Sequence, residues 1–509
     1  MTLENFPPLM FLGLILIMLI GFPVAFSLAA LGLISALVAI AQGWFPASFL
    51  SSLPLNVFGI LSNDLLLAIP FFTLMGAILE KCGLAEDMLD SMGQLFGPIR
   101  GGLGYSVIIV GFILGAITGT VAGQVIAMAM ISLPVMMRYG YNMRYATGVL
   151  AASGTITQLV PPSLVLVVLA DQLGKSVGDM YKGAWGPSML QIIIFALYTF
   201  VLTRLRPDYL PGIPKEARTL NGWALWAKCL RGIIPSAILI FAVLGSMGGL
   251  PGINTAIATP TEAGAMGAMG AAILALLHRR LDWPLVKEAM TGTMRMTAMV
   301  VFILIGSRMF SLVFQGVDGG VWIEHLLSNL PGGQIGFLIV VNIFVFFLAF
   351  FLDFFEIAFI ILPMLAPVAQ KLGIDMVWFG VLLCVNMQTS FMHPPFGFAL
   401  FYLRGISDTL FKNGALPRKV ESRDIYLGSI PWVVMQLILV VIVIFVPQTV
   451  TVFLDKEQAI DLDKVQIEAV SDGYQGNSAE EQKRIEEMFK DAAKADAEAA
   501  ARAASEPAR

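Results

Sequence analysis

The segment SGTITQLVPPS, residues 153–163, interrupts an apolar stretch of the chain with hydroxyl side chains and two consecutive prolines. Proline lacks the amide hydrogen and clashes with the preceding helical turn, so a helix must stop before Pro161. Proline is nevertheless well placed in the first turn of a new helix. The segment therefore predicts a broken helix at 145–172. A simple proline kink is the alternative, and the residues of this segment alone leave it open.

The chain around this break has the composition of a membrane protein. Of its 509 residues, 57% are hydrophobic and 13% are charged, with a mean hydropathy of +0.82. An ordinary soluble domain has about 25% charged residues. Several apolar runs approach or exceed the roughly 20 residues that cross a bilayer: residues 11–41, 233–249, 258–277, 298–314 and 433–454. We therefore expect an all-α polytopic membrane protein that contacts the lipid bilayer and no nucleic acid.

The distribution of lysine and arginine predicts the orientation of the chain. The linkers 204–231, 279–295 and 404–423 are rich in these residues and should be cytoplasmic, whereas 42–65 has none and should face outward. About five crossings then lie on each side of the cytoplasmic linker 204–231, and both termini lie outside. The tail 455–509, rich in Ala, Glu and Lys, should form an extracytoplasmic surface helix. Glu4 and the lack of a basic start argue against a cleaved signal peptide.

Two segments do not fit as simple crossings. Residues 102–139 are interrupted by GAITGTVAGQ at 115–124, which leaves two legs of about 15 residues, too short to span at 1.5 Å per residue. Residues 336–371 are interrupted in the same way at Asp353 and Glu356. Each segment predicts a re-entrant hairpin, and the orientation sends the two hairpins in from opposite faces.

A second broken helix, at 376–404, contains QTSFMHPPFG, residues 388–397. Its Pro394 follows Pro161 by 233 residues (394 − 161), and the same offset relates Gly140 to Gly373, Pro134 to Pro367 and Thr120 to Asp353. An odd number of crossings separates the copies, so they have opposite orientation. We therefore predict two inverted repeats of about five transmembrane helices each, at 1–203 and 232–454.

Inverted repeats with interrupted helices are typical of secondary transporters, whose sites lie near the midplane. Irregular backbone persists at membrane depth only where it lines a cavity or contacts protein. Free carbonyls near Gly154 suit a cation such as Na⁺, and free N–H groups after Val160 suit a carboxylate. Neutral oxygen ligands come from side chains at both breaks: Ser153, Thr155 and Thr157 in the first, and Asn386, Gln388, Thr389 and Ser390 in the second.

Other polar residues have alternative interpretations. Asp353 is either a functional carboxylate or the N-cap of the second hairpin leg, and the two roles are compatible. Glu356, one turn later, either serves the site or pairs with a polar side chain. His393 is a ligand, a proton carrier or a structural residue. Gly115, Gly119 and Gly123 either form the hairpin tip or serve close helix packing, and we assign no role to His278 or His325.

Six ordered motifs resemble the large membrane subunit of tripartite ATP-independent periplasmic (TRAP) transporters, and the resemblance extends to about residue 454. The motifs are IPFFTLMGAILEKCGLAEDML (69–89), GAITGTVAG (115–123), GVLAASGTITQLVPPS (148–163), ATPTEAGAMGA (258–268), FLDFFEIAFIILP (351–363) and NMQTSFMHPPFG (386–397).

The resemblance implies an elevator-type importer in the bacterial inner membrane, driven by Na⁺ as the coupling ion and without another cofactor. Its implied partners are a small four-helix membrane subunit, expected as a separate chain, and a periplasmic binding protein that delivers an organic acid. The hairpin tips would close over the two breaks. The residues assigned to sodium are Gly115, Thr118, Thr120, Gly154, Thr155, Asp353, Asn386, Gln388 and Thr389. Those assigned to substrate are Ser153, Thr157, Pro161, Pro162, Glu356, Ser390, His393, Pro394 and Pro395.

Two positions depart from the pattern of many family members, which have Pro after the tip Asp and Thr before the second double proline. Here these positions hold Phe354 and His393. Together with Glu356, they make the chain resemble the branch linked to 2-oxo acids or to mannitol and chloroaromatic compounds.

Other functional classes fit the sequence less well. The GKS at 174–176 has Leu169 where a phosphate-binding loop needs glycine, so a primary pump is not expected. Three scattered histidines and no HExxH motif argue against an enzyme. Cys82, Cys229 and Cys384 are odd in number and scattered, so we expect buried cysteines without a disulfide. A channel, or an organic anion transporter that needs no binding protein, is the remaining alternative.

Overall fold

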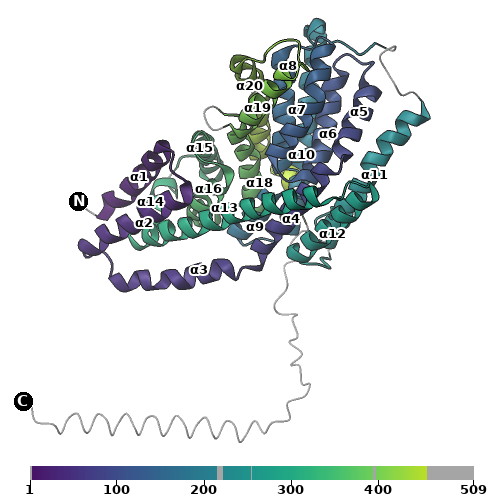
Figure 1. Cartoon of the computed structure of the whole chain (residues 1–509). Coiled ribbons are helices and arrows are strands. Elements are labelled where there is room, and N and C mark those ends of the chain that lie inside the picture. Colours follow the sequence, from purple (N-terminus) through teal and green to yellow (C-terminus); the bar gives the residue numbers. More distant parts are fainter. Residues whose placement is uncertain (1–2, 215–221, 254, 329, 394–396, 455–509) are drawn as a thin grey trace, which may run out of the picture. The chain divides into compact units, whose positions relative to one another are not determined.

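The computed structural model describes residues 3–214, 222–253, 255–328, 330–393 and 397–454, and every regular element within them is a helix (Figure 1). The predicted tail helix at 455–509 lies outside the described residues, as do Pro394 and Pro395. The described part is therefore the all-α polytopic protein that the composition predicts. Its three cysteines, Cys82, Cys229 and Cys384, are free and buried, as expected.

The first half of the chain contains ten α-helices before the linker near residue 215. They are α1 (Phe6–Ile20), α2 (Val24–Ala41), α3 (Leu53–Leu61), α4 (Asp64–Lys81), α5 (Leu84–Phe96), α6 (Gly102–Thr118), α7 (Val121–Arg138), α8 (Met143–Thr155), α9 (Leu164–Leu173) and α10 (Val177–Leu205). The helices of the second half are α11 (Trp223–Ser246), α12 (Pro260–Leu277), α13 (Trp283–Gly316), α14 (Gly319–Ser328), α15 (Gly333–Leu348), α16 (Phe354–Glu356), α17 (Leu362–Lys371), α18 (Met376–Met387), α19 (Phe398–Lys412), α20 (Ser422–Phe445) and α21 (Gln448–Thr451). A π-helical segment, Ile357–Ile361, joins α16 to α17.

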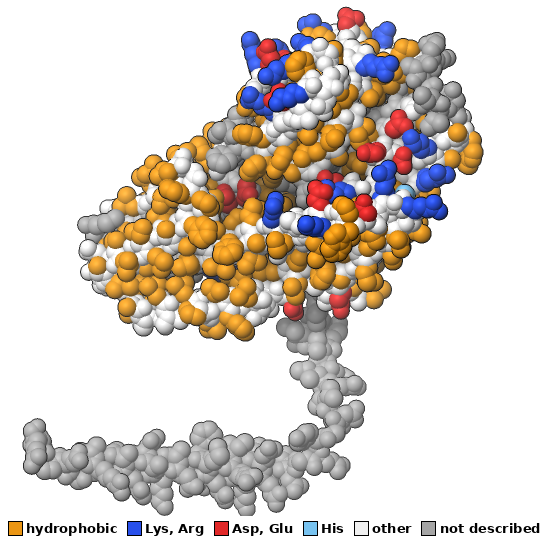
Figure 2. Space-filling model, in the orientation of Figure 1, with side chains coloured by type: hydrophobic (Ala, Val, Ile, Leu, Met, Phe, Trp, Pro, Cys, Tyr) orange, Lys and Arg blue, Asp and Glu red, His pale blue; other side chains and the backbone are white. Residues whose placement is uncertain are grey.

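Among the described residues, nine helices are long and apolar enough to cross a membrane, or up to eleven if each of two bent pairs is one span. Figure 2 shows hydrophobic side chains over the lower left of the view, where Figure 1 places α1 to α3 and α13. Exposed apolar side chains there include Leu16, Phe26, Leu37, Phe58 and Phe302. So much exposed apolar surface is stable only against lipid or another protein. The side that each loop faces stays a prediction.

The helix bounds of the two halves correspond at the 233-residue offset found in the sequence. Adding 233 carries Val121–Arg138 of α7 onto residues 354–371, the combined extent of α16, the π segment and α17. The same shift carries the start of α8, Met143, onto Met376, the start of α18. Asn142 and Asp375, also 233 residues apart, both cap their helices through side-chain oxygens. The correspondence supports two repeats; their opposite orientation stays a prediction.

Both predicted hairpins consist of two helical legs, α6 with α7 and α15 with α16–α17. The legs have 16 to 18 residues rather than about 15, so the length argument for re-entry was wrong. The helix continues through Gln124 and Pro134, where the apolar pattern falters. What distinguishes the first tip is burial: Thr118 is 1% exposed and contacts the first broken helix through Gln124. The tip therefore ends inside the protein.

The two halves are intertwined rather than separate. The hairpin helix α7 packs on α19, and α17 packs on α9, so each hairpin contacts the outgoing half of the other broken helix. The incoming halves are likewise covered by the other half's long helix, α8 by α20 and α18 by α10. The helices α1 to α4 and α11 to α13 pack mainly on one another at the side of this core. Residues from both halves thus meet at the two breaks.

Candidate transport site

The first break is fully buried and has two capped ends. Helix α8 ends at Thr155 and continues as a 3₁₀ turn, Ile156–Gln158, before Pro161 and Pro162. Helix α9 begins at Leu164, and the Ser163 hydroxyl accepts hydrogen bonds from the backbone N–H groups of Val165 and Leu166 at 3.2 and 3.5 Å. The segment thus folds as the predicted broken helix because the prolines prevent continuation and Ser163 starts a new helix.

Gln124, in the second leg of the first hairpin, is the centre of the polar contacts at this break. Its amide nitrogen donates to the carbonyl oxygens of Gly111 and Ser153 at 2.5 and 2.7 Å. Its carbonyl oxygen accepts from the hydroxyls of Thr118, at 3.3 Å, and Thr157. One buried side chain therefore joins both hairpin legs to the end of α8.

Three glycines allow the hairpin to approach the break closely. A Cβ atom on Gly111 would lie 2.7 Å from Ser153 Cβ, and one on Gly115 would lie 3.2 Å from Thr157 Cα. A Cβ on Gly154 would lie only 2.2 Å from a methyl carbon of Val125. Larger side chains at these positions would separate the hairpin from the residues that it covers.

The second break repeats this arrangement with different residues. Helix α18 ends at Met387 and continues as a 3₁₀ turn, Gln388–Met392. The amide nitrogen of Asn386 donates to the backbone oxygen and side-chain oxygen of Asn342, on hairpin leg α15, at 2.8 and 3.1 Å. The hydroxyls of Thr389 and Ser390 donate to the carbonyl oxygens three residues earlier, at 2.7 Å each. Asn342 here links hairpin and break, as Gln124 does in the first copy.

His393 lies between two aromatic rings of the second hairpin. Its ring stacks on Phe350 with centroids 4.4 Å apart and meets the edge of Phe346 at 4.6 Å. Both ring nitrogens are buried without a hydrogen-bond partner among the described residues. The contacts fix the position of the imidazole and leave its polar atoms available.

Asp353 and Glu356 cap the second hairpin leg reciprocally. The Asp353 carboxylate accepts from the Glu356 N–H at 3.0 Å, and the Glu356 carboxylate accepts from the Asp353 N–H at 3.0 Å. Within the described residues, no Lys, Arg or His forms an ion pair with either carboxylate. Two partly or fully buried carboxylates with only backbone donors favour a cation nearby.

The two breaks lie against each other. The Thr155 hydroxyl is 3.8 Å from Met392 Sδ, and the Cys384 thiol donates to the carbonyl oxygen of Gln158 at 3.3 Å. Several buried polar atoms at the breaks have no hydrogen-bond partner in the described part of the chain: Ser153 Oγ, Gln158 Oε1, Asn386 Oδ1 and Gln388 Nε2, besides His393. Buried polar atoms are normally paired, so this concentration indicates a place where ions or polar ligands bind.

Residues 11–449 match the family model described as the tripartite ATP-independent periplasmic transporter, DctM component. The chain belongs to this family. The predicted resemblance to the large TRAP membrane subunit is therefore confirmed, and the protein is a multi-pass transporter permease rather than an enzyme.

This TRAP permease is 29% identical over 420 residues to the C4-dicarboxylate TRAP transporter large permease protein DctM of Pseudomonas aeruginosa, covering 82% of this chain and 92% of the relative. It is 24% identical over 445 residues to the 2,3-diketo-L-gulonate TRAP transporter large permease protein YiaN of Escherichia coli, covering 87% and 97%. The isethionate TRAP transporter permease protein DctMQ of Oleidesulfovibrio alaskensis is 25% identical over 406 residues, covering 79% of this chain and 60% of the relative. The YdaH transporter structure from Alcanivorax borkumensis has a TM-score of 0.53 at 15% identity, covering 77% and 87%, and shows a similar fold.

In the permease, the predicted site residues fall into three groups. Gly115, Thr118, Ser153, Gly154 and Thr157 meet around Gln124, and Thr155 borders the second break. Asn386, Thr389, Ser390 and His393 line the second break beside hairpin leg α15. The carboxylates of Asp353 and Glu356 have hydrogen bonds to each other's backbone and none to the side chains of the second break among the described residues. Thr120 forms no side-chain cap at the first tip.

Sequence reasoning missed several polar residues of this region. Gln124, Asn342, Gln191 and Gln436 are all buried, and each contributes a side-chain amide to one of the breaks. Lys182 on α10 is a further buried polar residue, 3% exposed. An isolated amide or lysine inside an apolar helix is the only sequence signal for such residues, and by itself it does not give the partner.

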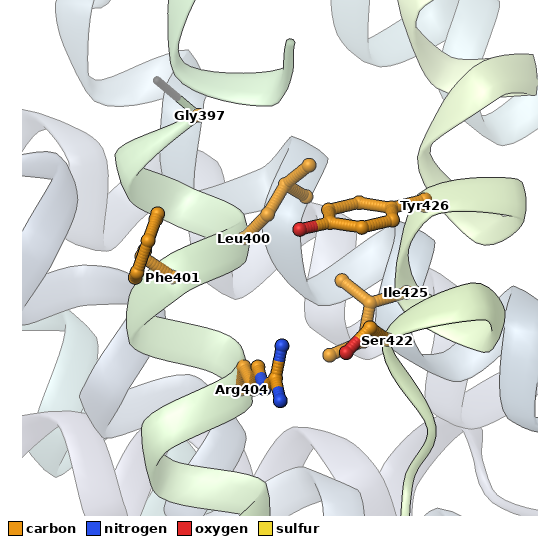
Figure 3. A pocket seen from close by; sticks show the side chains of 7 residues that line it. All are labelled: Gly397, Leu400, Phe401, Arg404, Ser422, Ile425 and Tyr426. Atoms are coloured by element: carbon orange, nitrogen blue, oxygen red, sulfur yellow. The ribbon is translucent and has the colours of Figure 1, made fainter. Parts of the chain in front are cut away.

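A small cavity between α19 and α20 lies on the way from the second break to the charged end of these helices (Figure 3). Gly397, Leu400, Phe401 and Arg404 line one side, and Ser422, Ile425 and Tyr426 line the other. Its volume of about 30 Å³ has room for about one water molecule and not for an organic acid. The substrate path in this conformation therefore does not run through it.

Proposed function

We propose that this permease is the large subunit of a Na⁺-coupled importer of small organic acids in the bacterial inner membrane. The observation that carries the proposal is the meeting of two buried helix breaks whose polar atoms lack protein partners. Secondary transporters place substrate and ion sites at such interruptions. The named substrates of three relatives, C4-dicarboxylates, 2,3-diketo-L-gulonate and isethionate, are all small organic anions.

The residues fit a sodium ion chemically. Ser153 Oγ and Asn386 Oδ1 are buried neutral oxygens without a partner among the described residues, one at each break. Asp353 and Glu356 supply negative charge in a second hairpin that contacts the second break through Phe354 and Phe391. Hard cations prefer such oxygen ligands. We assign the coupling-ion role to these groups with the hairpin tips as the covers.

The anion would interact with the opposite ends of the breaks. The N-terminus of α9 carries a partial positive charge, and Gln388 contributes an unpaired amide nitrogen. His393 could add a ring N–H from its place against Phe350. Phe354 and His393 are also the positions that set this chain apart from many family members, so the 2-oxo acid or chloroaromatic branch remains our prediction for substrate preference.

Two partner proteins belong to the proposal. A periplasmic binding protein would deliver the acid, and a small membrane subunit would cover part of the exposed apolar surface of α1 to α3 and α13. The name of the isethionate relative, DctMQ, and its greater length indicate that the small subunit can be fused. This chain spans 92% of the Pseudomonas relative, so we propose a separate small subunit here.

Reconstitution tests the proposal. The permease, its co-expressed small subunit and the binding protein encoded beside it are placed in proteoliposomes, after a ligand screen of that binding protein identifies the acid. We expect saturable uptake that needs an inward Na⁺ gradient and the binding protein. Passive flux of the acid without the binding protein would identify a channel instead, and uptake driven equally well by K⁺ would remove the assigned ion.

A further inference from the structure

Two buried glutamines connect each broken helix to the long helix of the other half. Gln191 on α10 donates its amide hydrogen to the side-chain oxygen of Gln388, in the second break, at 2.9 Å. Gln436 on α20 donates to the hydroxyl of Thr155, in the first break, at 3.0 Å. Both glutamines are at most 1% exposed. Each bond thus crosses between the halves of the chain.

The two bonds are equivalent under the repeat. Thr155 and Gln388 are separated by 233 residues, the offset that relates the two breaks. Helices α10 and α20 begin 245 residues apart (422 − 177), and Gln191 and Gln436 have the same separation. The chain therefore makes the same cross-contact twice, with matched donors and acceptors at matched positions.

Glycines at the same offset let the helices approach. Gly183 on α10 and Gly428 on α20 are also 245 residues apart. A Cβ on Gly428 would lie 2.2 Å from the carbonyl oxygen of Arg144, and one on Gly183 would lie 3.0 Å from Val377, the residue 233 positions after Arg144. Each glycine lies eight residues before its glutamine. The close helix contact thus begins about two turns before the amide bond on both sides.

The bonds leave different atoms of each acceptor free. Thr155 donates to the carbonyl oxygen of Ala152 at 2.9 Å and accepts from Gln436, so its oxygen retains one lone pair that can bind a cation. Gln388 uses its oxygen on Gln191, and its amide nitrogen is buried without a partner among the described residues. That nitrogen can only donate, which suits an anion and not Na⁺.

We propose that Gln436 and Gln191 are positioning residues: Gln436 orients Thr155 toward a cation, and Gln191 orients the Gln388 amide so that its N–H groups face an anion. The inference rests on the proposed function and refines it, because it moves Gln388 from the sodium ligands to the substrate contacts. The matched bonds give the two breaks different chemistry from one repeated architecture.

The first experiment tests the bonds themselves. Thermal unfolding midpoints are measured in Na⁺-free detergent buffer for Gln191→Leu, Gln388→Leu and the double variant, and for Gln436→Leu, Thr155→Val and their double variant. Partners in one hydrogen bond are non-additive, so each double variant should lose clearly less than the summed single losses. Thr203→Val on α10 and Ser429→Ala on α20 remove buried hydroxyls that bond only within their own helices and serve as controls. Additive losses in both cycles would overturn the cross-contacts.

The second experiment tests the positioning roles, with NaCl titrated against choline chloride and no organic acid present. We expect Gln436→Leu to raise the Na⁺ concentration for half-maximal thermal stabilisation about fivefold, the factor that corresponds to about 1 kcal/mol for one hydrogen bond. Gln191→Leu and Gln388→Leu should stay within twofold of wild type, although they lower the unfolding midpoint. Equal rises in all three variants would refute the division between cation and anion. If Na⁺ does not stabilise even the wild type, the proposed sodium coupling fails, while the first experiment still decides the cross-contacts.

Discussion

Replacing Asp353 by asparagine separates the two roles that this carboxylate can have. Its oxygen accepts from the Glu356 N–H at 3.0 Å as the N-cap of the second hairpin leg. Asparagine caps helices about as well as aspartate, whereas alanine costs about 1 kcal/mol, within a range of roughly 0.5–2. Asp353→Asn thus removes the charge and keeps the cap, and Asp353→Ala removes both.

The expected effect of the charge exceeds that of the cap. A unit charge about 4 Å from a cation contributes roughly 4 kcal/mol at an effective dielectric constant of about 20, which limits the loss of Na⁺ affinity to just under a thousandfold. Glu356 lies in the same capping box and can compensate in part. We therefore expect Asp353→Asn to raise the half-saturating Na⁺ concentration at least about tenfold, with an unfolding midpoint near that of wild type.

The assay is Na⁺-dependent uptake in proteoliposomes, together with the thermal shift caused by Na⁺ alone. Membrane insertion, followed by the yield of folded protein, should be retained in both variants. If Asp353→Asn has wild-type Na⁺ dependence while Asp353→Ala is impaired, Asp353 is only a cap. That result would remove it from the sodium site and leave Glu356 as the carboxylate to test.

Three further predictions follow from individual contacts. Thr155→Val removes the acceptor of Gln436 and should raise the half-saturating Na⁺ concentration severalfold without loss of insertion; unchanged Na⁺ dependence of uptake would exclude Thr155 from the ion site. Gly154→Ala places a Cβ 2.2 Å from Val125 and should slow uptake strongly, and adding Val125→Ala should restore part of the rate if crowding is the cause. Partial burial alone would raise the pKa of Asp90, but the hydrogen bond from Lys228 at 2.5 Å and a second from a neighbouring glutamine hold that pKa below its usual range. The contact should therefore stabilise the protein fully above the ordinary aspartate value of 3.8 and be lost as the pH falls through the lowered pKa. Thermal scans of Asp90→Asn should show under about 1 kcal/mol of destabilisation at pH 7, shrinking toward zero in acid, and a constant difference would contradict the ion pair.

Much of the fold could be predicted because its decisive residues act locally. Pro161 and Pro162 stop a helix whatever surrounds them, and Ser163 starts the next one. Asp353 and Glu356 show their capping pattern in their spacing alone. The leg lengths were underestimated for a related reason: Gln124 and Pro134 read as interruptions in a list of apolar residues, yet both lie inside α7.

The missed site residues have no local signal. Gln191 and Gln388 are 197 positions apart in the chain, and Gln436 and Thr155 are 281 apart. Their meeting depends on how α10 and α20 cross the opposite half, which hydrophobic periodicity does not specify. The amides are recognisable only after the repeat offset is applied separately to the breaks and to the long helices, because the two offsets, 233 and 245, differ.

Gln124 changes what the free carbonyls of the first break can do. The sequence argument assigns these carbonyls to a cation because a helix end leaves them unpaired. In the structure, Ser153 O already accepts from Gln124 at 2.7 Å, and Gly154 O lies 2.9 Å from the Thr157 hydroxyl. A carbonyl oxygen has two lone pairs, so each retains one for a cation. Because Gln124 also holds Thr118 at the hairpin tip, a shift of that tip must turn the same amide. Movement of the first hairpin and the direction of the Ser153 carbonyl are therefore linked through one side chain.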